Sequence, residues 1–303
     1  MRRRVAFAFL LLAHCSRPSA PHAEPDAAPP VPVTGSPRVD PGALLPPGAT
    51  ACASSAPTCF HFRTPENALR HVLARKPRVL AIGEAHAQKG SEKIASATKR
   101  FTESFLPILA PDTSDVVVEL WAPDPRCMKE VKQVASAQKP VTEVQAATNQ
   151  NEYLTLGTRA KAAGVTPWLL QPTCDDFSML ADAGAADIGA MLGLVKRLTQ
   201  ARVTRQLEKT RDKTVIAYGG ALHNDLVPAP EMRDYSFGPE LDQLSQGRYV
   251  ELDLIVPEYV KKTPPWEKLP WYAAFQAEPR DRTTLYALSE RSFVLVFPET
   301  PAQ

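Results

Sequence analysis

Short runs of nearly continuous apolar residues recur along the chain, and most of them are separated by segments with helical spacing. Strands that are apolar along their whole length are typical of parallel sheets with helices on both faces. We therefore predict an α/β fold with a mainly parallel central sheet flanked by helices, formed by a single domain. The expected strands are residues 79–83, 115–120, 166–171, 214–219, 249–256 and 292–297.

The spacing of apolar residues also predicts where helices lie between these strands. Ser91 is expected to cap a helix over residues 91–109, and a second helix is expected over residues 152–163. One long helix, or two shorter ones, should cover residues 179–211. The segment 257–291, which is rich in proline, tryptophan and tyrosine, is expected to pack over one edge of the sheet.

The part of the chain before this domain has a different composition. Three arginines at positions 2–4 precede a short apolar run over residues 5–13, a pattern typical of a secretory signal and too short for a membrane-spanning helix. Eleven of the 30 prolines lie in residues 16–58, and prolines at this density keep a chain extended. We therefore expect a signal over residues 1–15, a linker over 16–58 and the folded domain over 59–303.

The end of the signal, Leu-Ala-His-Cys at residues 12–15, resembles a bacterial lipobox. We expect Cys15 to carry a lipid that anchors the protein in the bacterial cell envelope, at the outer membrane or in the periplasm. Ordinary signal cleavage nearer Ala20 or Ala23 is the alternative. In the lipid-anchored form, the linker would hold the domain away from the membrane surface.

The charge balance limits the partners. The chain has 35 basic and 33 acidic residues, which leaves a formal net charge of +2. A nucleic-acid-binding protein that relies on electrostatics carries a much larger basic excess. We therefore expect no nucleic acid as a partner, and contact with a membrane only through the lipid.

The chain has five cysteines, an odd number for an exported protein. If Cys15 carries a lipid, four remain. Cys52 and Cys59 are close in sequence, and Cys127 and Cys174 each follow a predicted strand at the same edge of the sheet. We predict the disulfides Cys52–Cys59 and Cys127–Cys174 in an oxidising compartment, with buried free thiols as the alternative.

Titratable side chains gather at the ends of three predicted strands. The first strand runs into Gly-Glu-Ala-His, which contains Glu84 and His86, and the fourth runs into Gly-Ala-Leu-His, which ends at His223. Glu119 lies inside the second strand. Glu84 and His86 are two residues apart and point to the same side of an extended chain. Because ligands bind at the carboxyl ends of parallel strands, we expect these four side chains to share one site.

Two imidazoles and two carboxylates suit a divalent transition metal, and the same groups can act without one when a glutamate orients a histidine as general base. A purely structural alternative is an ion pair of Glu119 with Arg126 or Arg159. The chain lacks Gly-x-Ser-x-Gly, Gly-x-x-x-x-Gly-Lys and Gly-x-Gly-x-x-Gly, which argues against α/β serine hydrolases, nucleotide enzymes and dehydrogenases.

Other polar and aromatic residues are weaker candidates. Asn224 and Asp225 stand beside His223 and could set its tautomer. Asp175 and Asp176 follow the third strand, where a favourable position at a helix N-terminus is the simpler interpretation. The aromatic residues of segment 266–275 could close over the site as a lid or could anchor a proline-rich loop.

The strand-end motifs resemble those of the superfamily that contains Tiki and TraB proteins, ChaN-like lipoproteins and erythromycin-esterase-like hydrolases. The resemblance covers residues 77–225 and is closest to the ChaN-like lipoproteins. It implies an α/β fold in which Glu84, His86, Glu119 and His223 line the site. His86 would then be a base or metal ligand, Glu84 and Glu119 would orient it or share the metal, and His223 would stabilise charge or complete the coordination.

The resemblance implies two functions. The Tiki branch implies metal-dependent peptide hydrolysis, and the esterase branch implies lactone hydrolysis with histidine as general base. A metal-bound water with a pKa near ~7 can attack an ester or an amide. We therefore expect a cell-envelope hydrolase that uses a divalent transition metal and acts on a small-molecule or peptide substrate. The alternative is a haem- or iron-binding lipoprotein of the ChaN type, in which a histidine supplies an axial haem ligand.

Overall fold

One mixed sheet of nine strands organises the chain. The computed structural model describes residues 45–54, 57–183, 187–210 and 212–301, so Cys15 and the expected signal lie outside the described residues. The strand order is β1-β2-β8-β9-β7-β3-β6-β4-β5. The strands are β1 (Ala49–Ala51), β2 (Thr58–Phe62), β3 (Val79–Glu84), β4 (Thr113–Trp121), β5 (Thr166–Leu170), β6 (Thr214–Gly220), β7 (Tyr249–Ile255), β8 (Thr283–Ala287) and β9 (Ser292–Val296).

The six predicted strands form the parallel part of this sheet. Strands β9, β7, β3, β6, β4 and β5 pair with one another in parallel, and each matches a predicted range to within two residues at either end. Strands β8, β2 and β1 extend the sheet by antiparallel pairing. The prediction of a mainly parallel α/β fold is therefore confirmed, and three strands were missed.

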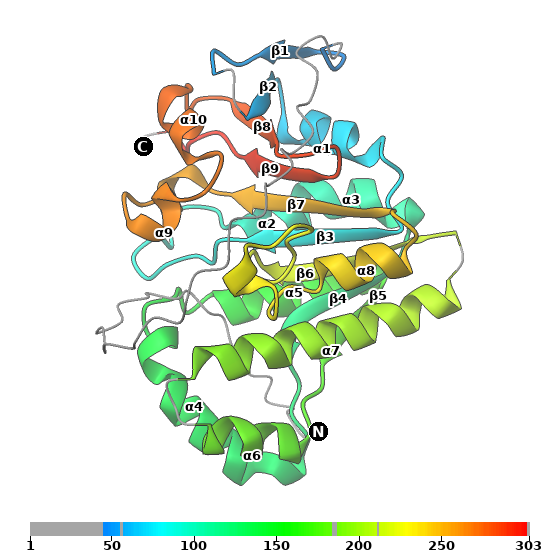
Figure 1. Cartoon of the computed structure of the whole chain (residues 1–303), viewed down its shortest axis with the longest axis vertical. Helices are drawn as coiled ribbons and strands as arrows, with labels where there is room; N and C mark the ends of the chain where they lie inside the picture. The colour runs from blue at the N-terminus through cyan, green and yellow to red at the C-terminus, as the bar shows by residue number, and fades with distance from the viewer. Residues whose placement is uncertain (1–44, 55–56, 184–186, 211, 302–303) are drawn as a thin grey trace, which may run out of the picture.

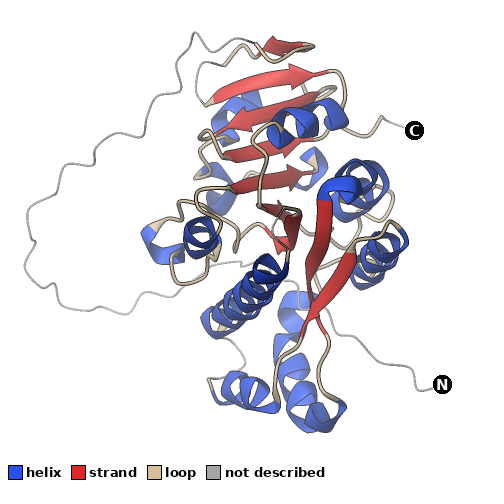
Figure 2. Cartoon of the chain, turned by 90° about the vertical axis from the view of Figure 1, so that its right-hand side faces the viewer, coloured by secondary structure: helices blue, strands red, loops and turns tan. Residues whose placement is uncertain are grey.

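Helices cover both faces of the sheet. Figure 1 shows α7 and α8 in front of the strands and α2, α3 and α5 behind them, and Figure 2 shows helices on both sides of a strongly twisted sheet. The helices are α1 (Pro65–Leu73), α2 (Ala97–Arg100), α3 (Leu106–Leu109), α4 (Met128–Thr142), α5 (Asn149–Ala162), α6 (Cys174–Asp182), α7 (Ile188–Lys209), α8 (Gly238–Leu244), α9 (Pro264–Glu267) and α10 (Tyr272–Ala277).

A hydrophobic cluster lies on each face of the sheet, and side chains of the central strand β3 belong to both clusters. Leu80 and Ile82 belong to the cluster that contains α1, α3 and α5, whereas Val79 and Ala81 belong to the cluster that contains α4, α6, α7 and α8. This alternation follows the two-residue period of a strand. It explains why the predicted strands are apolar along their whole length.

The prediction that Ser91 caps a helix was wrong. The Ser91 hydroxyl donates to the Gln88 carbonyl inside a turn, and Ser96 caps the helix instead by accepting from the Lys99 N–H at 2.9 Å. A π-helical turn at Phe101–Phe105 then connects α2 to α3. Both serines suit a cap, so the spacing of apolar residues did not distinguish them.

Segment 179–211 contains the last residues of α6 and the whole of α7, so it belongs to two helices, and each helix has its own cap. Thr173 and Asp176 form a capping box at α6, and the Asp187 carboxylate caps α7. Helix α7 has 22 residues, and none of the described helices meets the length and hydropathy needed to cross a membrane. The segment 257–291 holds α9 and α10, but it also contains β8, which pairs inside the sheet between β2 and β9.

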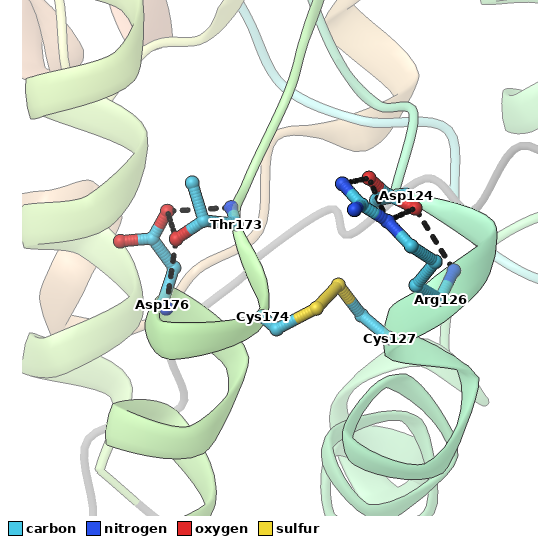
Figure 3. The surroundings of a disulfide bond; sticks show 6 residues. All are labelled: Asp124, Arg126, Cys127, Thr173, Cys174 and Asp176. Atoms are coloured by element: carbon cyan, nitrogen blue, oxygen red, sulfur yellow. Dashed lines mark hydrogen bonds and ion pairs between the residues drawn. A yellow bond between two sulfur atoms is a disulfide. The ribbon is translucent and has the colours of Figure 1, made fainter.

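Both predicted disulfides are present. Cys52–Cys59 joins the end of β1 to β2, and its Cα atoms lie 5.6 Å apart. Cys127–Cys174 joins the start of α4 to the start of α6, with Cα atoms 5.0 Å apart (Figure 3). The second bridge therefore ties together two helices that follow β4 and β5 at one edge of the sheet.

The disulfides should differ in their effect on stability. They join cysteines 7 and 47 residues apart. Loop-closure entropy then predicts a loss of ~2.5 kcal/mol in the free energy of unfolding without Cys52–Cys59 and ~4 kcal/mol without Cys127–Cys174. Urea unfolding of Cys52→Ala/Cys59→Ala and Cys127→Ala/Cys174→Ala measures both losses. A larger loss for the first double variant would contradict the prediction.

Candidate functional site

The imidazole of His86 is held by the carboxylate of Glu84. Strand β3 ends at Glu84, and the two side chains lie on the same side, with His86 Nδ1 and Glu84 Oε1 2.9 Å apart. Both residues are buried, at 1% and 4% exposure. Because a carboxylate accepts hydrogen bonds, Nδ1 carries the proton of the neutral imidazole, and Nε2 is then the nitrogen with the lone pair. His86 is therefore set up to accept a proton at Nε2.

Three hydroxyl groups surround the Glu84 carboxylate. Tyr153 of α5 donates to Oε1 at 2.9 Å, Thr98 of α2 donates to Oε2 at 2.8 Å, and Tyr218 of β6 lies 3.4 Å from Oε2. Burial raises the pKa of Glu84, but the hydrogen bonds from His86, Thr98 and Tyr153 and the charge of His86 outweigh it, so the pKa lies below its usual range. Glu84 is therefore charged although it is buried.

The sequence did not reveal these hydroxyl groups. Burial, followed by the charge of Glu84, raises the pKa of Tyr153 well above its usual value, and the same two causes act on Tyr218. Both phenols therefore stay protonated and serve as donors. Tyr153 stood in a predicted helix and Tyr218 in a predicted strand, and no local signal marked either as a partner of Glu84.

Glu119 reaches the site from the other face of the sheet. It alternates with Val116 and Val118, which belong to the cluster around α5, and its Oε2 accepts from the Gly220 N–H at 2.8 Å. A Cβ atom at Gly219 would lie 2.2 Å from Glu119 Oε2. The consecutive glycines at the end of β6 therefore make room for the carboxylate. Arg126 pairs with Asp124 instead, so it is not the partner of Glu119.

His223 lies beside Glu119 at the same edge of the sheet. Its Nε2 is 3.9 Å from Glu119 Oε1, and its Nδ1 lies 3.0 Å from the carbonyl oxygen of Tyr235. A carbonyl oxygen accepts, so Nδ1 donates and Nε2 faces Glu119. The expectation that Asn224 or Asp225 sets this tautomer was wrong, because the Tyr235 carbonyl already does so.

The two pairs meet at Gly220. A Cβ atom placed on Gly220 would lie 3.2 Å from His86 Nε2 and 3.8 Å from Glu119 Oε2. A cavity of about 10 Å³, lined by Glu119, Gly220 and neighbouring residues, lies at the same place and is about the size needed for one water. The structure thus brings Glu84, His86, Glu119 and His223 together around the ends of β3, β4 and β6.

The donor set fits a metal only in part. Among the described residues, no three of these four side chains offer ligand atoms that all lie within 4.8 Å of one another. Glu84 Oε1 accepts from both His86 and Tyr153, and Oε2 faces both Thr98 and Tyr218, so the two lone pairs of each oxygen are used. The remaining donors are His86 Nε2, Glu119 and His223 Nε2. His86 Nε2 belongs to the Glu84–His86 pair and the other two donors to the Glu119–His223 pair, so the three do not enclose one point.

A second group of carboxylates lies beside this site, in which Glu251 is buried and Asp253 and Asp225 are half-buried. Asp253 and Glu251 alternate along β7, Asn224 Nδ2 donates to Asp253 Oδ1 at 2.8 Å, and the Leu226 N–H donates to Glu251 at 2.7 Å. Burial and then the charge of Asp225 raise the pKa of Asp253 to about 7. Two acidic residues at alternate positions in an apolar strand were the sequence signal for this group, and it was overlooked.

The weaker candidates serve the fold. Asp176 belongs to the capping box of α6 and accepts from Arg197. Trp271 and Phe275 pack with Ala85 and Tyr286 in a third hydrophobic cluster. The aromatic segment therefore anchors the chain against the residue between Glu84 and His86.

A larger pocket adjoins the residue that follows His86. It measures about 420 Å³. The carbonyl oxygen of Ala87 accepts from Ala146 N at 2.9 Å and from Asn149 Nδ2 at 3.0 Å, and both donors belong to residues that line this pocket. Its other lining residues are Lys89, Glu92, Thr142, Glu143, Gln145, Ala147 and Gln150.

Comparisons of the chain with protein-family models, curated protein sequences and solved structures give no match. The likeness of the strand-end motifs to the Tiki and ChaN-like superfamily therefore stays a prediction.

The carboxylate group on β7 predicts a dependence of stability on pH. The pKa of Asp253 rises from 3.8 in the unfolded chain to about 7, so the folded state holds this proton more tightly. Its contribution to stability is complete below pH 3.8 and is lost as the pH rises through about 7. Asp253→Asn keeps an oxygen acceptor for Asn224 but cannot ionise. We expect it to lower the unfolding equilibrium constant at pH 8 by at least ~10-fold.

Chemical unfolding between pH 5 and pH 8 measures this effect. The exposed carboxylate variant Asp281→Asn is the control, and its pH dependence should match that of the unmodified protein. A pH dependence of Asp253→Asn that also matches the unmodified protein would contradict the assignment.

Proposed function

We propose that this protein hydrolyses an ester or amide bond, with His86 as the general base. The observation that carries the proposal is the 2.9 Å hydrogen bond from His86 Nδ1 to Glu84 Oε1, with Nε2 left free beside Gly220. In the reaction, Nε2 takes a proton from a water molecule as its oxygen attacks the substrate carbonyl carbon. A positioned base of this kind contributes roughly 10²- to 10⁴-fold to a rate.

Glu84 acts by positioning and charge. Its negative charge stabilises the imidazolium that forms when His86 accepts the proton. The hydroxyl groups of Tyr153 and Thr98 keep the carboxylate oriented, and they keep its pKa low. This arrangement costs little reorganisation during the reaction, because the donors are already in place.

Glu119 and His223 act on the other side of the reacting bond. Glu119 is held by the Gly220 N–H, and His223 Nε2 faces its second oxygen at 3.9 Å. When His223 is protonated, Glu119 stabilises the added charge. His223 can then stabilise the tetrahedral oxyanion or donate a proton to the leaving group.

Access to His86 involves the neighbouring pocket. All four site residues are buried, and the cavity beside Glu119 is about the size of one water. We place the substrate in the 420 Å³ pocket next to Ala87, a volume suited to a small molecule or a short peptide. The pocket is tied to the site by the Ala87 carbonyl, one residue beyond His86, which accepts from Ala146 and Asn149 of the pocket lining.

Two further parts of the proposal concern cofactor and location. The proposed reaction runs without a metal, since the donors belong to two separate pairs. If a metal binds, His86 Nε2, Glu119 and His223 are the side chains that would hold it, and it would activate the attacking water. The haem alternative gains no support from the small cavity beside Glu119. Location in the cell envelope is supported by two disulfides, which persist in oxidising compartments.

Kinetic measurements on the purified protein test the proposal. After screening aryl esters, lactones and short peptides, we expect His86→Gln to lower kcat by ~10²- to 10⁴-fold, because the general base is lost. His71→Gln is the matched control, since His71 packs against Phe60, Phe62 and Phe293 away from the site. Full activity of His86→Gln would overturn the proposal.

The pH profile separates positioning by Glu84 from a merely structural role. Glu84→Gln removes the negative charge beside His86, so the imidazolium is less stable and the acid limb of kcat/KM should move to lower pH.

A chelator in the same assay reports whether a metal is needed. A Soret shift on haem addition that His86→Ala abolishes, in a protein without hydrolytic turnover, would favour the haem alternative.

A further inference from the structure

A second set of ligand-type side chains lies far along the sheet from His86. The Sγ atoms of Cys52 and Cys59 and a carboxylate oxygen of Glu278 all lie within 4.8 Å of one another. Within the described part of the chain, this is the one set of three histidine, cysteine or acidic residues that meets this distance. Strand β2 is separated from β3 by β8, β9 and β7, so the set is separate from the candidate hydrolytic site.

The backbone holds the two cysteines together independently of their bond. Cys59 lies in β2, which pairs along its length with β8. The Cys52 N–H donates to the Cys59 carbonyl oxygen at 3.3 Å. These contacts keep the two side chains adjacent when the disulfide is reduced. Cys52 is half-buried and Cys59 is buried, so a reagent approaches from the side of Cys52.

Glu278 is held in place by its own hydrogen bonds. The Ser54 N–H donates to Oε1 at 2.7 Å, and His61 Nε2 lies 2.9 Å from Oε2. His61 Nδ1 lies 3.1 Å from the Thr284 hydroxyl oxygen. Metal-binding carboxylates are commonly oriented by hydrogen bonds of this kind.

We propose that Cys52, Cys59 and Glu278 form a redox-gated binding site for a thiophilic divalent cation such as Zn²⁺. In the oxidised protein the sulfur atoms are bonded to each other, and the site is closed. In the reduced protein two thiolates and one carboxylate supply three ligands, and water supplies the fourth. Tetrahedral Zn²⁺ has bonds of ~2.0–2.3 Å, so its ligand atoms lie roughly 3.3–3.8 Å apart, within reach of this set.

The chemistry balances with a dithiol as reductant. The dithiol gives two electrons and two protons to the Cys52–Cys59 bond, which breaks, and the dithiol itself becomes a disulfide. The two cysteine thiols then release their protons as their sulfur atoms bind Zn²⁺. Binding is therefore expected to weaken as the pH falls.

The second disulfide provides a matched control within the same chain. No histidine or acidic side chain among the described residues completes a set of three with Cys127 and Cys174. The nearby Asp176 accepts from the Thr173 hydroxyl in the capping box of α6, and Asp124 forms an ion pair with Arg126 (Figure 3). Reduction of this bridge exposes two thiols without a third ligand.

Metal titration of the reduced full chain tests the proposal. The protein is reduced with a phosphine, freed of it by gel filtration, and titrated with Cd²⁺, whose bond to thiolates absorbs in the ultraviolet. We expect Cys127→Ala/Cys174→Ala to bind one equivalent at least tenfold more tightly than Cys52→Ala/Cys59→Ala. Equal affinities, or no binding by the first variant, would overturn the proposal.

The role of Glu278 is tested in the same assay with Zn²⁺ in competition with a chromophoric chelator. Glu278→Gln should weaken binding by the reduced protein at least tenfold, whereas the exposed Glu267→Gln should leave it unchanged. Equal affinities would overturn the site. The unmodified protein gives a further test that needs no variant, the number of tightly bound Zn²⁺ ions before and after reduction. We expect the reduced protein to hold one more Zn²⁺ than the oxidised protein. No gain on reduction would overturn the proposal.

Discussion

The buried carboxylate of Glu84 ties together the elements that meet at the candidate site. It lies at the end of the central strand β3 and accepts hydrogen bonds from a loop histidine, a tyrosine of α5 and a threonine of α2. An unpaired buried carboxylate is costly, so these donors are a condition for its burial. The same contacts determine which nitrogen of His86 carries the proton. The packing of one face of the sheet and the chemistry of the site therefore depend on one side chain.

The pKa values of Glu84 and Asp253, which lie on opposite faces of the sheet, are shifted in opposite directions. Around Glu84, several donors and His86 stabilise the charged form, and its pKa is lowered. On β7, burial and neighbouring carboxylates oppose charge, and the pKa of Asp253 rises to about 7. Gly83, the residue before Glu84, lies against Asp253, since a Cβ atom on Gly83 would be 2.2 Å from Asp253 Oδ1. The glycine at the end of β3 thus leaves room for an acid that is largely neutral below neutral pH.

The parallel part of the fold could be predicted because burial on both faces leaves a simple pattern of apolar runs. The gathering of the four strand-end residues and the Cys127–Cys174 bridge could be predicted because parallel strands end at one edge, whereas Cys52–Cys59 could be predicted because the two cysteines are close in sequence. The antiparallel strands β1, β2 and β8 were missed, since they are short, and β8 stands in a segment whose prolines and aromatic residues suggested a loop. Tyr153 and Thr98 were missed because their contact with Glu84 depends on how distant helices pack, which no local periodicity reports.

The tautomer of His86 tests the central claim most directly. Nitrogen-15 NMR of the imidazole distinguishes a protonated nitrogen from one with a lone pair. The measurement is made on the oxidised full chain at a pH where His86 is neutral. We expect Nδ1 to carry the proton, held by Glu84, and Nε2 to be bare and able to act as the base. A proton on Nε2 in the unmodified protein would contradict this expectation.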